Sequence, residues 1–168
     1  EDRTVLVVIK RSDMSRTNQV LPKPQQHVTG FDWASSEQLV FSVSRKDGYF
    51  AAPRPNGYLY RVAAAGGKSE LLGVDRLSLL DPLPGDARHV LVRHYSGQGR
   101  DPISLLDLET GKIDVEYMNH TTLNGATYIV DNAGDIRFAD GHAGYEIKSR
   151  LQQRGEDGEW REIHSEKD

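Results

Sequence analysis

The sequence predicts an all-β protein, a partial β-propeller of about three four-stranded antiparallel blades and one leading strand. Apolar runs of four to seven residues are separated by clusters drawn from 16 glycines and seven prolines, and helical periodicity is nearly absent. The runs fall into groups of four that begin at residues 28, 77 and 125, which are 49 and 48 residues apart. A repeat of this length with four strands is typical of propeller blades.

Four strands are expected in each group. The first blade, 28–74, is predicted to hold strands at 28–31, 39–44, 58–62 and 69–72. The second blade, 75–119, is predicted to hold strands at 77–80, 89–93, 103–107 and 114–117. The third blade, 120–168, is predicted to hold strands at 125–130, 135–139, 145–150 and 160–164. The glycine-bearing turn before the last strand favours a hairpin over a terminal helix.

Residues 1–27 are interpreted as the leading strand and loop of a preceding blade. Residues 5–9 form an unbroken apolar run, as expected of a strand that is covered on both faces. Residues 10–26 are polar and contain two prolines, which predicts a long loop. The second irregular stretch, 45–57, mixes aromatic, cationic and proline residues, and both a ligand contact and a simple surface crossover stay open for it.

Turn chemistry repeats with the same period. Polar hairpins that contain glycine separate the third and fourth strands of the groups at 65–68, 109–112 and 155–158. Comparable polar turns separate the first and second strands at 35–37, 84–86 and 131–134. This double recurrence favours repeated blades over the alternative, a non-repeating β-sandwich with similar strand spacing.

Composition excludes several classes of protein. The net charge of −4 offers no basic surface for nucleic acid, and the longest apolar run is far too short to span a membrane. The absence of cysteine excludes disulfides, thiolate metal sites and a cysteine nucleophile. With 168 residues, one domain is expected. A soluble protein of the cytoplasm or the periplasm fits equally well.

No catalytic, cofactor or metal residue is predicted. Six histidines are scattered without the spacing of metal ligands: His27, His89, His94, His120, His142 and His164. The turn that starts at Asp131 lacks the alternating ligands of a calcium loop, which favours an Asx turn. Gly97 and Gly99 precede no Gly-Lys-Ser/Thr, so they indicate a loop between strands, and the sequon at 119–121 is assigned no role.

Several motifs along the chain together match the pattern of one known family. In the first blade they are FDWA (31–34), LYRV (59–62) and GGKSELL (66–72). Later in the chain they are LLDPLP (79–84), LDLETGK (106–112), DNAGDIR (131–137) and GEWR (158–161). In this order they resemble the amino-terminal propeller of the prolyl oligopeptidase family of serine peptidases. The later segments are similar to the acylaminoacyl-peptidase and dipeptidyl-peptidase-like members, and the likeness covers about residues 28–165.

The resemblance implies that the chain is the non-catalytic propeller part of a serine peptidase and controls the access of peptides to an α/β-hydrolase domain. The G-x-S-x-G elbow of such a domain does not occur in these 168 residues, so the chain alone is expected to be inactive. The implied partners are the peptide substrate and the hydrolase domain. A TolB-like propeller that binds proteins, without a peptidase domain, is the alternative. Because three blades leave apolar end faces, self-association is also expected.

Overall fold

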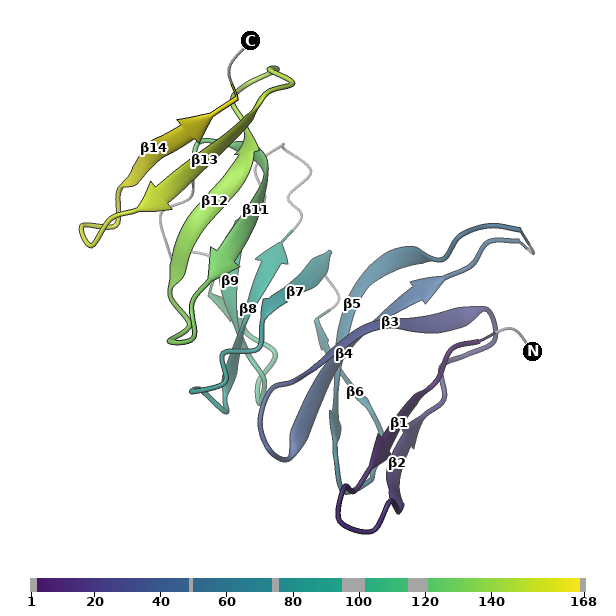
Figure 1. Cartoon of the computed structure of the whole chain (residues 1–168). Helices are drawn as coiled ribbons and strands as arrows, with labels where there is room; N and C mark the ends of the chain where they lie inside the picture. Colours follow the sequence, from purple (N-terminus) through teal and green to yellow (C-terminus); the bar gives the residue numbers. More distant parts are fainter. Residues whose placement is uncertain (1–2, 49, 74–75, 95–101, 115–120, 167–168) are drawn as a thin grey trace.

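The computed structural model describes residues 3–48, 50–73, 76–94, 102–114 and 121–166. These residues form fourteen β-strands and contain no helix, which confirms the predicted all-β class. Three sheets each consist of four consecutive antiparallel strands, and a fourth sheet has two strands. The sheets follow one another along the chain in one row, with β1–β2 at the lower right and β11–β14 at the upper left (Figure 1). This is a propeller-like arrangement of blades, not a sandwich of two sheets.

The two-stranded sheet consists of β1 (Leu6–Ile9) and β2 (Arg16–Val20). The prediction of a loop throughout 10–26 is therefore wrong, because β2 lies within it and pairs antiparallel with the leading strand. Most residues of β2 are polar, but its side chains alternate between two faces, and Asn18 and Val20 point inward and are buried. Only residues 10–15 form the turn between the two strands. A hydrogen bond from the Met14 N–H to the Lys10 carbonyl closes this turn.

The other three sheets correspond to the three predicted groups. The first contains β3 (Gln26–Trp33), β4 (Gln38–Arg45), β5 (Arg54–Ala63) and β6 (Glu70–Gly73). The second contains β7 (Leu77–Asp81), β8 (His89–His94), β9 (Ile103–Asp107) and β10 (Ile113–Asp114). The third contains β11 (Asn124–Val130), β12 (Ile136–His142), β13 (Ser149–Arg154) and β14 (Trp160–Ser165).

Two predicted boundaries need correction. The start of β5 lies at Arg54, inside the stretch predicted to be irregular, because its first residues pair with the end of β4. The strand predicted at 145–150 is displaced to 149–154, since Tyr145 and Ile147 lie fully exposed before β13. The hairpin at 155–158 is confirmed, and a strand follows it instead of a helix. Residues 115–117 of the strand predicted at 114–117 lie outside the described residues.

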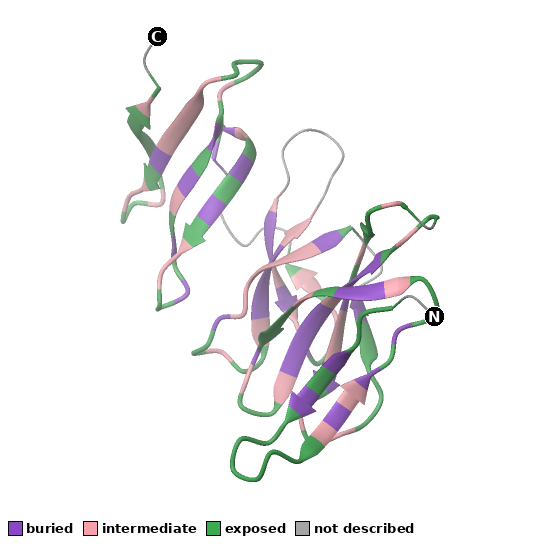
Figure 2. Cartoon of the chain, turned by 45° about the vertical axis from the view of Figure 1, so that its right-hand side comes forward, coloured by how far each residue is buried: buried purple, intermediate pink, exposed green. Residues whose placement is uncertain are grey.

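Three apolar clusters lie between neighbouring sheets, and the central strands contribute to clusters on both of their faces. Along β8, Val90 and Val92 face the cluster shared with β3–β6, while Leu91 faces the cluster shared with β11–β14. Along β4, Val40 faces the cluster shared with the second sheet, while Phe41 faces the cluster shared with the β1–β2 hairpin. Figure 2 shows these strands as largely buried. The nearly continuous apolar sequences of β4 and β8 follow from this burial on both faces.

A polar side chain also joins each pair of neighbouring sheets. The Asn18 amide donates to the Ala63 carbonyl at 2.6 Å, joining β2 to the end of β5. The Arg61 guanidinium of β5 donates to the Leu108 carbonyl at 2.5 Å, and that of Arg93 in β8 donates to the Ala126 carbonyl at 2.5 Å. Each junction therefore combines an apolar cluster with a directional polar contact that helps to align the sheets.

Candidate functional site

The turns that join odd-numbered to even-numbered strands lie along one edge of the row of sheets, which we call the turn end. The β3–β4 turn and Pro84 of the β7–β8 turn line one cavity, and Gly134 of the β11–β12 turn lies against Leu83. The β5–β6 turn approaches β2, where a Cβ on Gly66 would lie 3.4 Å from the Thr17 carbonyl oxygen. This turn end brings together loops from every sheet and is where the described cavities of the first two sheets open.

Trp33 lies between two of these cavities. One has a volume of about 460 Å³ and is lined by the end of β1, the β3–β4 turn and the β5–β6 turn. The other, about 440 Å³, is lined by Trp33, the rest of the β3–β4 turn and Pro84. Trp33 pairs with Leu39 and points to the same face as the buried cluster, but it lies beyond the cover of the β1–β2 hairpin and is 45% exposed.

The larger cavity is a mainly apolar groove that also contains polar side chains. Its walls include Val8, Ile9 and the alanines at 63–65, while Lys10 and Glu37 supply one charge of each sign. An open groove of this kind can accept a short extended peptide segment, with apolar side chains against Trp33. In the sequence, Trp33 lies in the FDWA motif, and no local signal marks a groove there, because its walls come from three separate segments.

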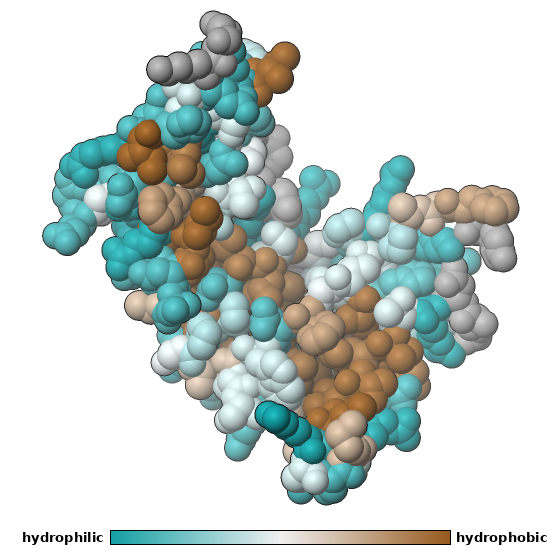
Figure 3. All heavy atoms as spheres, viewed as in Figure 1, coloured by the Kyte–Doolittle hydropathy of each residue, from teal (hydrophilic) through white to brown (hydrophobic). Residues whose placement is uncertain are grey.

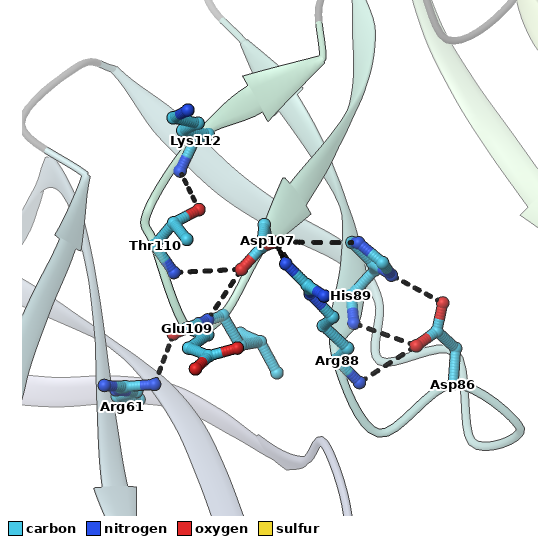
Figure 4. Close-up of polar contacts among 9 residues, drawn as sticks. Arg61, Asp86, Arg88, His89, Asp107, Glu109, Thr110 and Lys112 are labelled. Carbon is cyan, nitrogen blue, oxygen red and sulfur yellow. Dashed lines mark hydrogen bonds and ion pairs between the residues drawn. The ribbon is translucent and has the colours of Figure 1, made fainter.

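A polar network at the same end is centred on Asp107 (Figure 4). One carboxylate oxygen accepts hydrogen bonds from the backbone N–H groups of Glu109 and Thr110, at 2.8 and 2.9 Å. The other oxygen accepts from Arg88 at 2.8 Å and lies 3.9 Å from the His89 ring. His89 in turn contacts the Asp86 carboxylate at 2.7 Å. The network closes the β9–β10 turn and ties it to β8, so its role is to shape the turn end.

Asx turns of the same form recur in the third sheet. Asp131 accepts from the backbone N–H groups of Ala133 and Asp135, which confirms the predicted Asx turn, and Arg137 pairs with its other oxygen. Asp157 accepts from the Glu159 N–H and pairs with Arg161. The pKa values of Asp107, Asp131 and Asp157 are all lowered. The leading cause is the Thr110 N–H for Asp107 and a paired arginine for the other two.

These carboxylates predict loss of stability in acid. A lowered pKa means that the folded state binds protons more weakly than the unfolded state, so stability is fully present above the ordinary value of 3.8 and declines as the pH falls below it. Asp107→Asn keeps a side-chain oxygen for the turn but does not titrate there. We expect its thermal midpoint to fall less steeply than that of the wild type between about pH 5 and pH 2. Equal slopes in a series of melts would contradict the assignment.

The described histidines lie in separate environments. His27 is buried and contacts the Thr4 hydroxyl, His142 contacts the Lys148 carbonyl, and His164 is exposed on β14. Within the described ranges, no three His, Asp or Glu side chains gather as metal ligands would. His120, Gly97, Gly99 and the first two residues of the sequon lie outside the described residues. Thr121 is buried and donates its hydroxyl hydrogen to Gln152.

Comparison of the chain with protein-family models, curated proteins and solved structures found no match. In the part of the chain that the structure describes, no helix is long and apolar enough to cross a membrane.

Proposed function

We propose that this chain is the non-catalytic, propeller-like part of a serine peptidase of the prolyl oligopeptidase family, where it controls which peptides reach an α/β-hydrolase active site. The observation that carries the proposal is the stack of antiparallel four-stranded sheets formed by the same segments that resemble that family. A stack of blades is rigid and has loops at its ends. Placed over an active site, such a stack admits extended peptides and excludes folded proteins by size.

The groove beside Trp33 supports a role in contacting peptides. It lies at the turn end, where loops of neighbouring sheets meet, and its apolar walls suit an unfolded segment better than a charged metabolite. In this proposal the chain contributes binding and access, and the chemistry belongs to a hydrolase domain outside these residues. The substrate class is short or unfolded peptides.

Labelling with a serine-reactive phosphonate tests the peptidase assignment. The purified 168-residue chain is expected to remain unlabelled and to hydrolyse no peptide. The product of the complete reading frame is expected to carry the label on a serine outside these residues, within a G-x-S-x-G sequence. Phosphonate-sensitive hydrolysis by the chain itself would refute the non-catalytic role, and an unlabelled complete protein would refute the peptidase assignment.

The second candidate is a TolB-like module that binds proteins without a peptidase domain. The position of Trp33 between two open cavities favours it, because exposed tryptophan is enriched where proteins bind one another. In a Trp160→Phe chain, Trp33 is the remaining tryptophan and reports directly on the groove. Extended peptides without tryptophan should shift its emission to the blue, and should leave a Trp33→Phe chain unchanged. Binding together with an unlabelled complete protein would favour this candidate.

A further inference from the structure

One end of the row of sheets is an uncovered apolar face on β1. Leu6 and Val8 point into the cluster shared with β3–β5 and are buried. The alternate residues Val5 and Val7 point the other way and are 37% and 40% exposed. Ile9, which follows a register shift in β1 and is 50% exposed, borders the groove beside Trp33. The sequence of β1 is thus apolar on both faces, like β4 and β8, but only one of its faces is covered. Strands of this composition are normally buried on both sides.

The other end is the outer face of the β11–β14 sheet. Ile129 of β11 pairs with Phe138 of β12, and both point away from the cluster that holds Tyr128 and Ala139. Leu151 of β13 lies on the same outer face, and Ile163 lies at the β-bulge of β14 that faces it. Ile129 and Ile163 are each about half exposed. Figure 3 shows apolar side chains gathered over this sheet at the upper left and over the β1–β4 region at the lower right.

The two ends carry opposite charge. Residues 1–26 contain five Lys or Arg and three Asp or Glu, a net +2, whereas residues 121–168 contain six and ten, a net −4. The charges also fall at matching places, because the β1–β2 turn and the β13–β14 turn both join an odd-numbered strand to an even-numbered one. The first carries exposed Lys10 and Arg11 and one acid, Asp13, which pairs with Lys10. The second carries exposed Glu156, Asp157 and Glu159, of which Asp157 pairs with Arg161.

We propose that the chain associates head to tail with a second copy, the β1–β2 face of each copy packing on the outer β11–β14 face of the other. The contact continues the stacking seen inside the chain, with Val5 and Val7 against Leu151 and Ile163. It places the cationic β1–β2 turn beside the acidic β13–β14 turn. Complementary charge at matching ends favours this pairing over contacts between identical faces, which would bring like charges together.

A head-to-tail contact either closes into a ring or grows into a filament. Two copies supply six four-stranded sheets and two two-stranded sheets, so a closed pair falls within the size range of propellers, about four to eight blades. The proposed state is therefore a dimer of twice 18.8 kDa in which both contacts are used. The proposal concerns the 168-residue chain and rests on its two end faces. In the peptidase proposed above, further parts of the same polypeptide would occupy these faces, so failure of the dimer would leave the peptidase assignment untouched.

Sedimentation velocity of two opposite variants tests the proposal. Val7→Asp places an acid on the first face, and Ile163→Lys places a cation on the second. Each variant alone should weaken dimerisation by more than about tenfold, because the contact would bury an unpaired charge beside like charge. An equal mixture should restore the dimer, since each variant keeps the intact face that the other lacks. Leu71→Lys, at an equally exposed position on β6, is the matched control and should remain dimeric.

Each other outcome contradicts the proposal. A wild-type chain that stays monomeric up to about 100 μM excludes a contact of useful strength. A dimer that survives one of the two variants indicates a contact between identical faces, and a mixture that remains monomeric excludes the head-to-tail arrangement. Growth beyond the dimer excludes ring closure. Far-UV circular dichroism spectra of the variants that match the wild-type spectrum establish that the exposed substitutions leave the fold intact.

Discussion

Replacing Leu106 with alanine is expected to lower the free energy of unfolding by about 3 kcal/mol, within the usual range for a buried leucine. Leu106 of β9 is fully buried in the cluster between the first and second sheets, where Leu59 and Val90 also lie. The substitution removes apolar contacts and leaves a cavity that two paired sheets cannot easily collapse, because their backbones are fixed by hydrogen bonds.

Urea denaturation followed by circular dichroism measures the effect of Leu106→Ala. Leu71→Ala is the matched control, since Leu71 is the same residue type on the neighbouring sheet but is 46% exposed. The control should change stability by less than about 0.5 kcal/mol. Equal losses for the two variants would mean that the first and second sheets do not pack face to face as described.

Gly111→Ala is expected to cost about 3 kcal/mol or more, for two separate reasons. Gly111 closes the β9–β10 turn with a φ of +70°, a conformation that residues with a Cβ adopt only with strain. A Cβ there would also lie 2.6 Å from the Leu72 carbonyl oxygen of the preceding sheet. The substitution would therefore push the turn away from β6 and disturb the junction between the two sheets.

Gly144→Ala separates these two causes. Gly144 has a similar φ of +58°, but nothing lies within 4 Å of the position its Cβ would take. Its cost should be the backbone strain alone, about 1–2 kcal/mol. A larger loss for Gly111→Ala than for Gly144→Ala in the same thermal melts measures the close approach of the two sheets. Equal losses would show that the close approach contributes nothing.

The sequence predicts those parts of the fold whose strands are buried on both faces. β4 and β8 stand out because Val40 and Val90 lie in unbroken apolar runs, and the turns around them contain glycine, an Asx residue or serine. β2 escapes detection because its inward residues are few and one of them is Asn18, whose amide satisfies the Ala63 carbonyl across the junction. β13 is misplaced because Ile147 has strand character but lies in an exposed turn.

The candidate groove could not be predicted from sequence. Its walls come from β1, the β3–β4 turn and the β5–β6 turn, so it depends on how the hairpin packs across the first full sheet. The exposure of Trp33 has the same origin, since its strand partner Leu39 is buried by that hairpin. Local patterns specify strands and turns, whereas cavities between sheets depend on tertiary alignment.

The most direct test of the account is a set of methyl NOE measurements on β8, where adjacent residues should report different neighbours. The methyl groups of Val90 and Val92 should give NOEs to Leu59 or Leu72 of the first sheet, and those of Leu91 should give NOEs to Leu123 or Ala139. This separation is what a stack of blades requires of a central strand. If Leu91 showed no contact with the third sheet, or shared the neighbours of Val92, the propeller-like stacking would be contradicted.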